Sequence, residues 1–173
     1  MKLIRVHIVK AATCGGLLDG LDVGLRGALE GPVPFEPLCL VGPNGAGKSQ
    51  FLQVVAEAFQ TVFHACVDKE ERAKGNEDLQ FEIEYFIRTE GDSDPVHVRL
   101  SRRGEGKRRP VLKIERNDGV EWVDCAVGEP ATAALLPSRI IGYTSGGYET
   151  LSLPLRVSRS GYADAVGKQA LGR

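Results

Sequence analysis

Long apolar runs are missing from the sequence, and so is an excess of charge of either sign. No apolar segment approaches the roughly 20 residues that a membrane-spanning helix needs, so the sequence predicts no contact with a membrane. Residues 1–7 carry too many charges for a secretory signal, and we expect a cytoplasmic protein. With 22 Lys and Arg against 23 Asp and Glu, binding to nucleic acid would require a local basic patch.

Cysteine is also sparse. The 4 cysteines are scattered and form no C-x-x-C pair, so the sequence does not support a zinc site. Cys39 and Cys66 fall within apolar patterns and are predicted to be small core residues with reduced thiols. The chain has 173 residues, of which 42% are hydrophobic, and this fits one globular domain or one incomplete larger domain.

A phosphate-binding motif is the most informative feature of the sequence. The pattern G-x-x-x-x-G-K-[ST] is matched at every specified position by Gly42, Pro43, Asn44, Gly45, Ala46, Gly47, Lys48 and Ser49. The glycines allow the backbone to turn its N–H groups toward phosphate oxygens, and Lys48 can contact the β- and γ-phosphates. Lys48 is the residue that we predict to be catalytic. The Ser49 hydroxyl is the expected protein ligand of a nucleotide-bound Mg²⁺, and Gln50 completes the predicted nucleotide-binding segment.

The residues around the motif predict a strand before it and a helix after it. The apolar run 38–41 has the composition of a buried parallel strand. From residue 47 to about residue 67, apolar side chains recur at steps of three and four residues, which is typical of an amphipathic helix. The positive end of that helix would point at the bound phosphates. His64 lies in this helix, and we interpret it as structural.

Alternating apolar residues predict several further strands. They are expected over residues 3–9 and 21–25, and then over 79–88, 96–100, 111–114 and 120–123. The last four would form an antiparallel β subdomain over residues 79–124. Glu82 and Glu84 alternate with apolar residues, so we assign them to the outer face of a half-exposed strand rather than to a catalytic pair. Another buried strand is expected over residues 139–143, and the start of a helix over 160–171.

Five basic residues crowd the turn between two of the predicted strands. They are Arg102, Arg103, Lys107, Arg108 and Arg109. This is the only strongly basic patch of the sequence, and it is the candidate contact with the phosphate backbone of DNA or RNA. Glu105 interrupts the patch and no aromatic stacking platform accompanies it, so we favour a solvated hairpin tip, with DNA binding as the alternative.

The loop sequence resembles the Walker A motif of ABC-type ATPases, including the RecF/SMC-like branch. The order of the predicted elements is similar over residues 1 to about 145. A second stretch, residues 141–154, resembles a segment of the restriction-system-associated AAA-family ATPases of bacteria, which implies DNA-directed defence. The resemblance implies an α/β fold of the P-loop NTPase class, namely an ABC-ATPase-like N-terminal lobe with a mixed sheet and an antiparallel β subdomain. It implies ATP and Mg²⁺ as cofactors.

Other parts of such an ATPase site are missing from the sequence. A Walker B strand is apolar and ends in an Asp that holds Mg²⁺, whereas residues 122–124 are too short and fall within the meander. Residues 145–149 resemble an ABC signature loop only superficially, because no Walker B strand follows. We therefore expect residues 1–173 to form a single incomplete P-loop NTPase domain, whose ATP hydrolysis requires carboxylates from a partner subunit or a second copy.

Two other functions fit parts of the pattern. A small P-loop kinase has a suitable length, but its P-loop would lie nearer the N-terminus and would be followed by helices rather than strands. A nucleotide-binding assembly module that does not hydrolyse ATP is consistent with the missing Walker B strand.

Overall fold

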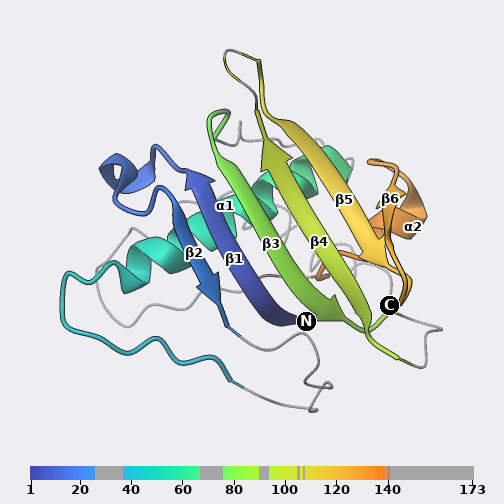
Figure 1. Ribbon diagram of the computed structural model, residues 1–173, viewed down its shortest axis with the longest axis horizontal. Helices are drawn as coiled ribbons and strands as arrows, with labels where there is room; N and C mark the ends of the chain where they lie inside the picture. Colours follow the sequence, from blue (N-terminus) through green and yellow to red (C-terminus); the bar gives the residue numbers. More distant parts are fainter. Residues whose placement is uncertain are drawn as a thin grey trace, which may run out of the picture.

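The computed structural model describes residues 1–25, 37–66, 76–89, 94–104, 106, 108–138 and 140 (Figure 1). The elements in chain order are β1 (Lys2–Lys10), the 3₁₀ turn η1 (Thr13–Gly16), β2 (Leu21–Gly24), α1 (Lys48–Cys66), β3 (Gln80–Ile87), β4 (Val96–Arg103), β5 (Val111–Asn117), β6 (Trp122–Cys125) and α2 (Pro130–Ala133). The predictions for Lys107, for the strand at 139–143 apart from Ile140, and for residues 141–154 and 160–171 lie outside the described residues. No helix of the described part is long and apolar enough to cross a membrane.

The six strands form one antiparallel sheet in the order β2-β1-β3-β4-β5-β6. Both β2 and β3 pair with β1 in the antiparallel sense, so they run in the same direction with β1 between them. The chain passes from β2 to β3 through α1, which lies across one face of the sheet (Figure 1). The strands predicted at these six places and the helix after the loop are confirmed, with boundaries that differ by a few residues.

The hydrophobic core lies between α1 and one face of the sheet. Side chains alternate along a strand, so residues two apart share a face. The sheet contributes Val6, Ile8, Phe81, Ile83, Tyr85, Ile87, Val98, Leu100 and Ile114, all buried. The helix contributes Phe51, Val54, Ala58, Phe59, Val62 and Cys66. Apolar burial of this extent is the dominant force that holds the helix on the sheet.

The end of the core is closed by α2 and the residues after it. Leu135 and Leu136 are buried in the same cluster. The Tyr85 hydroxyl donates a hydrogen bond of 2.8 Å to the Leu135 carbonyl oxygen, and its ring centroid lies 5.7 Å from that of Phe59. Burial raises the pKa of the Tyr85 hydroxyl, because ionisation would place a charge in this apolar environment.

The predicted fold class, an α/β P-loop NTPase with a mixed sheet, is wrong. The described residues form a mainly β architecture, with one all-antiparallel sheet and one long helix. Residues 38–41 lead into the loop without pairing with any described strand, and Val41 is 93% exposed. A run of four apolar residues does not distinguish a buried strand from an extended connection. Cys66 is buried as predicted, but Cys39 lies in this connection and is exposed.

Candidate functional site

The segment that matches the P-loop pattern forms a turn directly before α1. Gly45 and Gly47 both have φ of 84°, in the left-handed region that glycine adopts without strain. The Phe51 N–H donates to the Gly47 carbonyl oxygen over 2.8 Å, so the first helical hydrogen bond starts from the last glycine of the loop. The N–H groups that precede this bond in an α-helix have no acceptor within the helix, and they point with the positive end of the helix dipole toward the loop.

Lys48 folds back over the loop from the first position of α1. Its ammonium donates to two carbonyl oxygens, that of Gly42 over 2.8 Å and that of Pro43 over 2.7 Å. The ammonium therefore lies at the opening of the loop, where a positive charge can meet an incoming phosphate. Ser49 and Asn44 are exposed, and Gln50 is half-buried.

This arrangement can hold an anion with several oxygen atoms. The loop offers backbone N–H groups, a helix N-terminus and one ammonium within a single stretch of chain, and phosphate binds at such places. The hydroxyl of Ser49 follows the ammonium directly and can reach a cation that the phosphates bring with them. Among the described residues, no cluster of three or more His, Cys, Asp or Glu side chains could hold a metal ion.

The loop between β1 and β2 supports one side of this segment. A Cβ placed on Gly47 would lie 3.5 Å from Leu18 Cδ2 and 3.9 Å from Leu17 Cδ2, so the β1–β2 loop comes close to the last glycine. Asp19 accepts a hydrogen bond of 2.7 Å from the Ala11 N–H and thereby closes the loop on itself. The sequence analysis missed Leu17 and Leu18 because only the folded chain brings them to the P-loop segment.

The other face of the sheet, which we call the open face, carries a network of charged side chains around Glu84. The Glu84 carboxylate is buried and accepts hydrogen bonds from His97 Nε2 over 3.1 Å and from Arg99 Nε over 3.3 Å. Arg5 lies 3.7 Å away and is shared with Asp22 and Glu82. The hydrogen bond from His97 lowers the pKa of the Glu84 carboxyl, against the opposing effect of burial, and the charge of Arg99 adds to the lowering.

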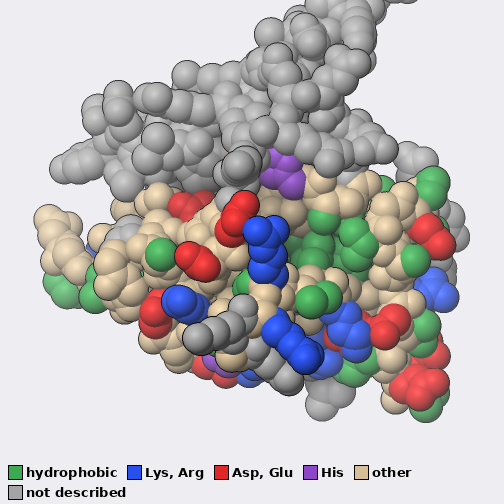
Figure 2. Space-filling model, turned by 90° about the horizontal axis from the view of Figure 1, so that it is seen from above, with side chains coloured by type: hydrophobic (Ala, Val, Ile, Leu, Met, Phe, Trp, Pro, Cys, Tyr) green, Lys and Arg blue, Asp and Glu red, His purple; other side chains and the backbone are tan. Residues whose placement is uncertain are grey.

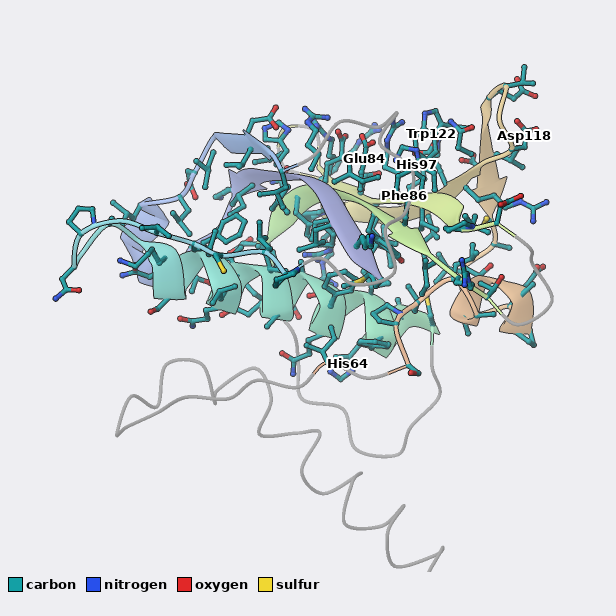
Figure 3. All side chains as sticks on the ribbon, turned by 90° about the horizontal axis from the view of Figure 1, so that it is seen from below. His64, Glu84, Phe86, His97, Asp118 and Trp122 are labelled. Atoms are coloured by element: carbon teal, nitrogen blue, oxygen red, sulfur yellow. The ribbon has the colours of Figure 1, made fainter. Side chains whose placement is uncertain are left out.

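Three rings form a row beside this network. His97 lies between Phe86, at a centroid distance of 4.9 Å, and Trp122, at 4.7 Å. The Arg99 guanidinium lies 3.9 Å from the centroid of the Trp122 ring, within the range of a cation–π contact. Figure 3 shows Glu84, His97 and Trp122 on the side of the sheet opposite α1, and His64 on the side of α1 that faces away from the sheet.

Glu82 and Glu84 therefore lie on the open face, as predicted, but Glu84 is covered by its neighbours rather than half-exposed. Glu82 pairs with Arg5 over 2.7 Å and with Arg103 over 3.1 Å. The two carboxylates are thus structural partners of cations. The covering of a polar face by its own long side chains could not be read from the alternation alone.

Two of the five residues of the predicted basic patch are separated by the fold. Arg102 and Arg103 are neighbours at the end of β4, so their side chains leave the strand on opposite faces. Arg102 donates to the backbone carbonyl oxygens of Asn76 (3.0 Å), Leu79 (2.6 Å) and Glu77 (2.9 Å), and burial lowers its pKa.

The other described basic residues of that turn lie at the surface. Arg103 is paired with Glu82, whereas Arg108 and Arg109 are exposed. Figure 2, which looks onto the end of the molecule with the β4–β5 turn, shows basic and acidic side chains interspersed over the described residues. The structure thus separates Arg102 from Arg103, and DNA binding by the other basic residues stays a prediction.

The P-loop segment is therefore the described part of the chain that best fits a binding function, and its surroundings differ from those that the resemblance implies. The expected core strand before the loop is an unpaired extended segment, and residues 122–124 belong to β6, where Asp124 lies 2.8 Å from the ammonium of Lys113. Comparison of the chain with known protein families, curated proteins and solved structures finds no match in any of the three.

Proposed function

We propose that the chain binds a nucleoside triphosphate, ATP in the first instance, together with Mg²⁺ through residues 42–50. The observation that carries the proposal is the Lys48 ammonium, held at the opening of a glycine turn by the carbonyl oxygens of Gly42 and Pro43. The positive φ of Gly45 and Gly47 supports it, since the turn of the motif requires glycine at such places. The binding chemistry is local to loop and helix, so it does not depend on a parallel sheet.

In this proposal each part of the segment has one role. The loop amides and the first turn of α1 hold the α- and β-phosphates, Lys48 neutralises the β- and γ-phosphates, and Ser49 contributes its hydroxyl to the Mg²⁺. Turnover of ATP would further need carboxylates that position water and metal. We propose that such groups come from a partner subunit, from a second copy or from residues outside the described part.

The experiment is a comparison of Mg·ATP binding by calorimetry for the wild type, Lys48→Ala and Lys113→Ala. Lys113→Ala is the matched control, because it removes the same charge from the sheet. There the Lys113 ammonium contacts Glu115 and Asp124 over 2.8 Å each. We expect Lys48→Ala to weaken Mg·ATP binding by at least tenfold, because this variant loses about one charge-assisted hydrogen bond to phosphate. Lys113→Ala loses no such bond and should keep an affinity within twofold of the wild type. Equal affinities of the three proteins, or no binding by the wild type, would refute the proposal.

A further inference from the structure

The turn before α1 contains an asparagine that a glycine follows. The sequence has three asparagines, at positions 44, 76 and 117. Glutamate follows the second and aspartate follows the third, whereas Gly45 follows Asn44. A backbone nitrogen can attack the side-chain carbonyl carbon of the asparagine before it, and glycine hinders this attack least because it has no Cβ. Asn44 therefore has the neighbour that most favours deamidation.

Asn44 and Gly45 occupy the two central positions of a turn. The Ala46 N–H donates to the Pro43 carbonyl oxygen over 3.3 Å, which closes the turn around them. Both central residues are exposed, and Gly45 has φ of 84°, which a residue with a Cβ adopts only with strain. A Cβ added to Gly45 would meet no atom of the described residues within 4 Å. The turn thus leaves room for the backbone to rotate during a reaction.

The other two asparagines are held by hydrogen bonds of their side chains. Asn76 Oδ1 accepts from the Asp78 N–H over 3.1 Å, and Asn117 Oδ1 accepts from the Gly119 N–H over 2.7 Å. Such bonds fix the side-chain amide in one orientation. No hydrogen bond to another described residue fixes the side chain of Asn44 in this way. The Asn44 amide is therefore the one that is free to turn toward the backbone nitrogen that follows it.

We propose that Asn44 is a site of spontaneous deamidation, and that this reaction inactivates the phosphate-binding loop. The backbone nitrogen of Gly45 gives its proton to base in the solvent and bonds to Asn44 Cγ. The bond from Cγ to Nδ2 breaks, and ammonia leaves with a proton from the solvent. Water then opens the resulting succinimide ring at either carbonyl carbon, so that position 44 becomes an aspartyl or an isoaspartyl residue. Water is the only reactant besides the chain.

The product places a negative charge in the loop. The Lys48 ammonium lies 2.7 Å from the carbonyl oxygen of Pro43, the residue directly before Asn44. A carboxylate that forms one residue further along repels a phosphate that approaches this ammonium, and an isoaspartyl linkage also adds a backbone carbon to the turn. The reactivity of Asn44 follows from the turn alone, whereas its effect on ATP binding rests on the proposed function.

The first measurement follows the masses of the peptides that contain the three asparagines. The wild type is incubated without nucleotide in mildly alkaline buffer and digested with trypsin, which leaves each asparagine in a separate peptide. We expect the Asn44 peptide to gain about 1 Da, the difference between an amide and an acid, about fivefold faster than the peptides of Asn76 and Asn117 or more. An Asn44 peptide that converts no faster than the other two would overturn the assignment.

The second measurement compares Mg·ATP binding by calorimetry before and after this incubation, for the wild type and Asn44→Gln. Glutamine deamidates much more slowly, because its attack has to form a larger ring. We expect the wild type to lose binding sites in proportion to its converted fraction, and Asn44→Gln to lose none relative to its own fresh sample. Fresh Asn44→Asp, which carries the charge of the product, should bind Mg·ATP about tenfold more weakly than the fresh wild type or worse.

The results separate the two parts of the proposal. Converted wild type that still binds Mg·ATP at every site would overturn the inactivation, even though Asn44 reacts. If the fresh wild type does not bind Mg·ATP, the proposed function fails and the inactivation fails with it. In that case the peptide masses still establish or refute the reactivity of Asn44.

Discussion

Replacement of Glu84 by Gln is the most informative change on the open face of the sheet. Glu84 lies among one imidazole and two guanidinium groups, with His97 at 3.1 Å, Arg99 at 3.3 Å and Arg5 at 3.7 Å. Glutamine keeps the shape of the side chain but removes its charge. The substitution therefore isolates the electrostatic part of the network from its packing.

The expected loss follows from the partners that remain. A hydrogen bond to a charged group contributes about 1.5–3 kcal/mol, and Glu84 accepts two of them. Arg5 keeps Asp22 and Glu82, and the amide oxygen of glutamine can still accept one hydrogen bond. We therefore expect the free energy of unfolding to fall by about 2 kcal/mol, which is a decrease in Tm of about 4–8 °C for a chain of this size.

The assay is urea denaturation at pH 7, with Asp124→Asn as the control. Asp124 contacts Lys113 on the same face but its side chain is 70% exposed, so its loss should change stability by about 0.5 kcal/mol or less. A Glu84→Gln variant that is no less stable than Asp124→Asn would refute the account of the open face, because the carboxylate would then contribute no more than an exposed one.

The same variant has a defined pH dependence. The folded-state pKa of Glu84 is lowered from its ordinary value of 4.5, so its contribution is fully present above that pH and is lost as the pH falls through the folded pKa. The difference in stability between wild type and Glu84→Gln should be constant above about pH 5 and should shrink at lower pH. A constant difference down to pH 2 would contradict this.

Further substitutions test the core, the segment that precedes β3, and the loop before α1. Tyr85→Phe should lower the free energy of unfolding by about 1 kcal/mol, because the hydrogen bond to Leu135 is lost. Since burial raises the Tyr85 pKa, the wild type should also lose stability as the pH rises above about 10, and thermal unfolding of the variant should lack that part of the loss. Arg102→Ala removes donors from three backbone carbonyl oxygens and should cost about 2 kcal/mol, whereas the exposed Arg109→Ala should stay within about 0.5 kcal/mol; equal effects would contradict the different roles. Gly47→Ala forces φ of 84° on a residue with a Cβ, and should cost about 1–2 kcal/mol of stability and weaken tripolyphosphate binding.

Local patterns were sufficient to predict the six strands and the long helix. The period-two alternation around Phe81 and Ile83 and the three- and four-residue steps from Phe51 identify β3 and α1, because each pattern reports which side chains share one face. The glycine turn with Lys48 at the start of a helix was likewise visible, since its residues are consecutive.

The assembly of the elements could not be predicted in the same way. Residues 38–41 have the composition of a buried strand, and no local signal shows that they lack a neighbour to pair with. Placing β3 beside β1 rather than beside β2 depends on long-range pairing, such as that of Val6 with Ile83. The split of Arg102 from Arg103 and the approach of Leu17 to Gly47 are also consequences of the tertiary fold.

The central claim is that residues 42–50 hold the phosphates of a nucleotide. Backbone amide NMR with Mg·ATP tests it most directly, because it reports both binding and its place. The account predicts shift changes concentrated in the amides of residues 42–50, with little change in β5 and β6. Changes centred on the open face around His97 and Trp122, or no change at millimolar Mg·ATP, would contradict it.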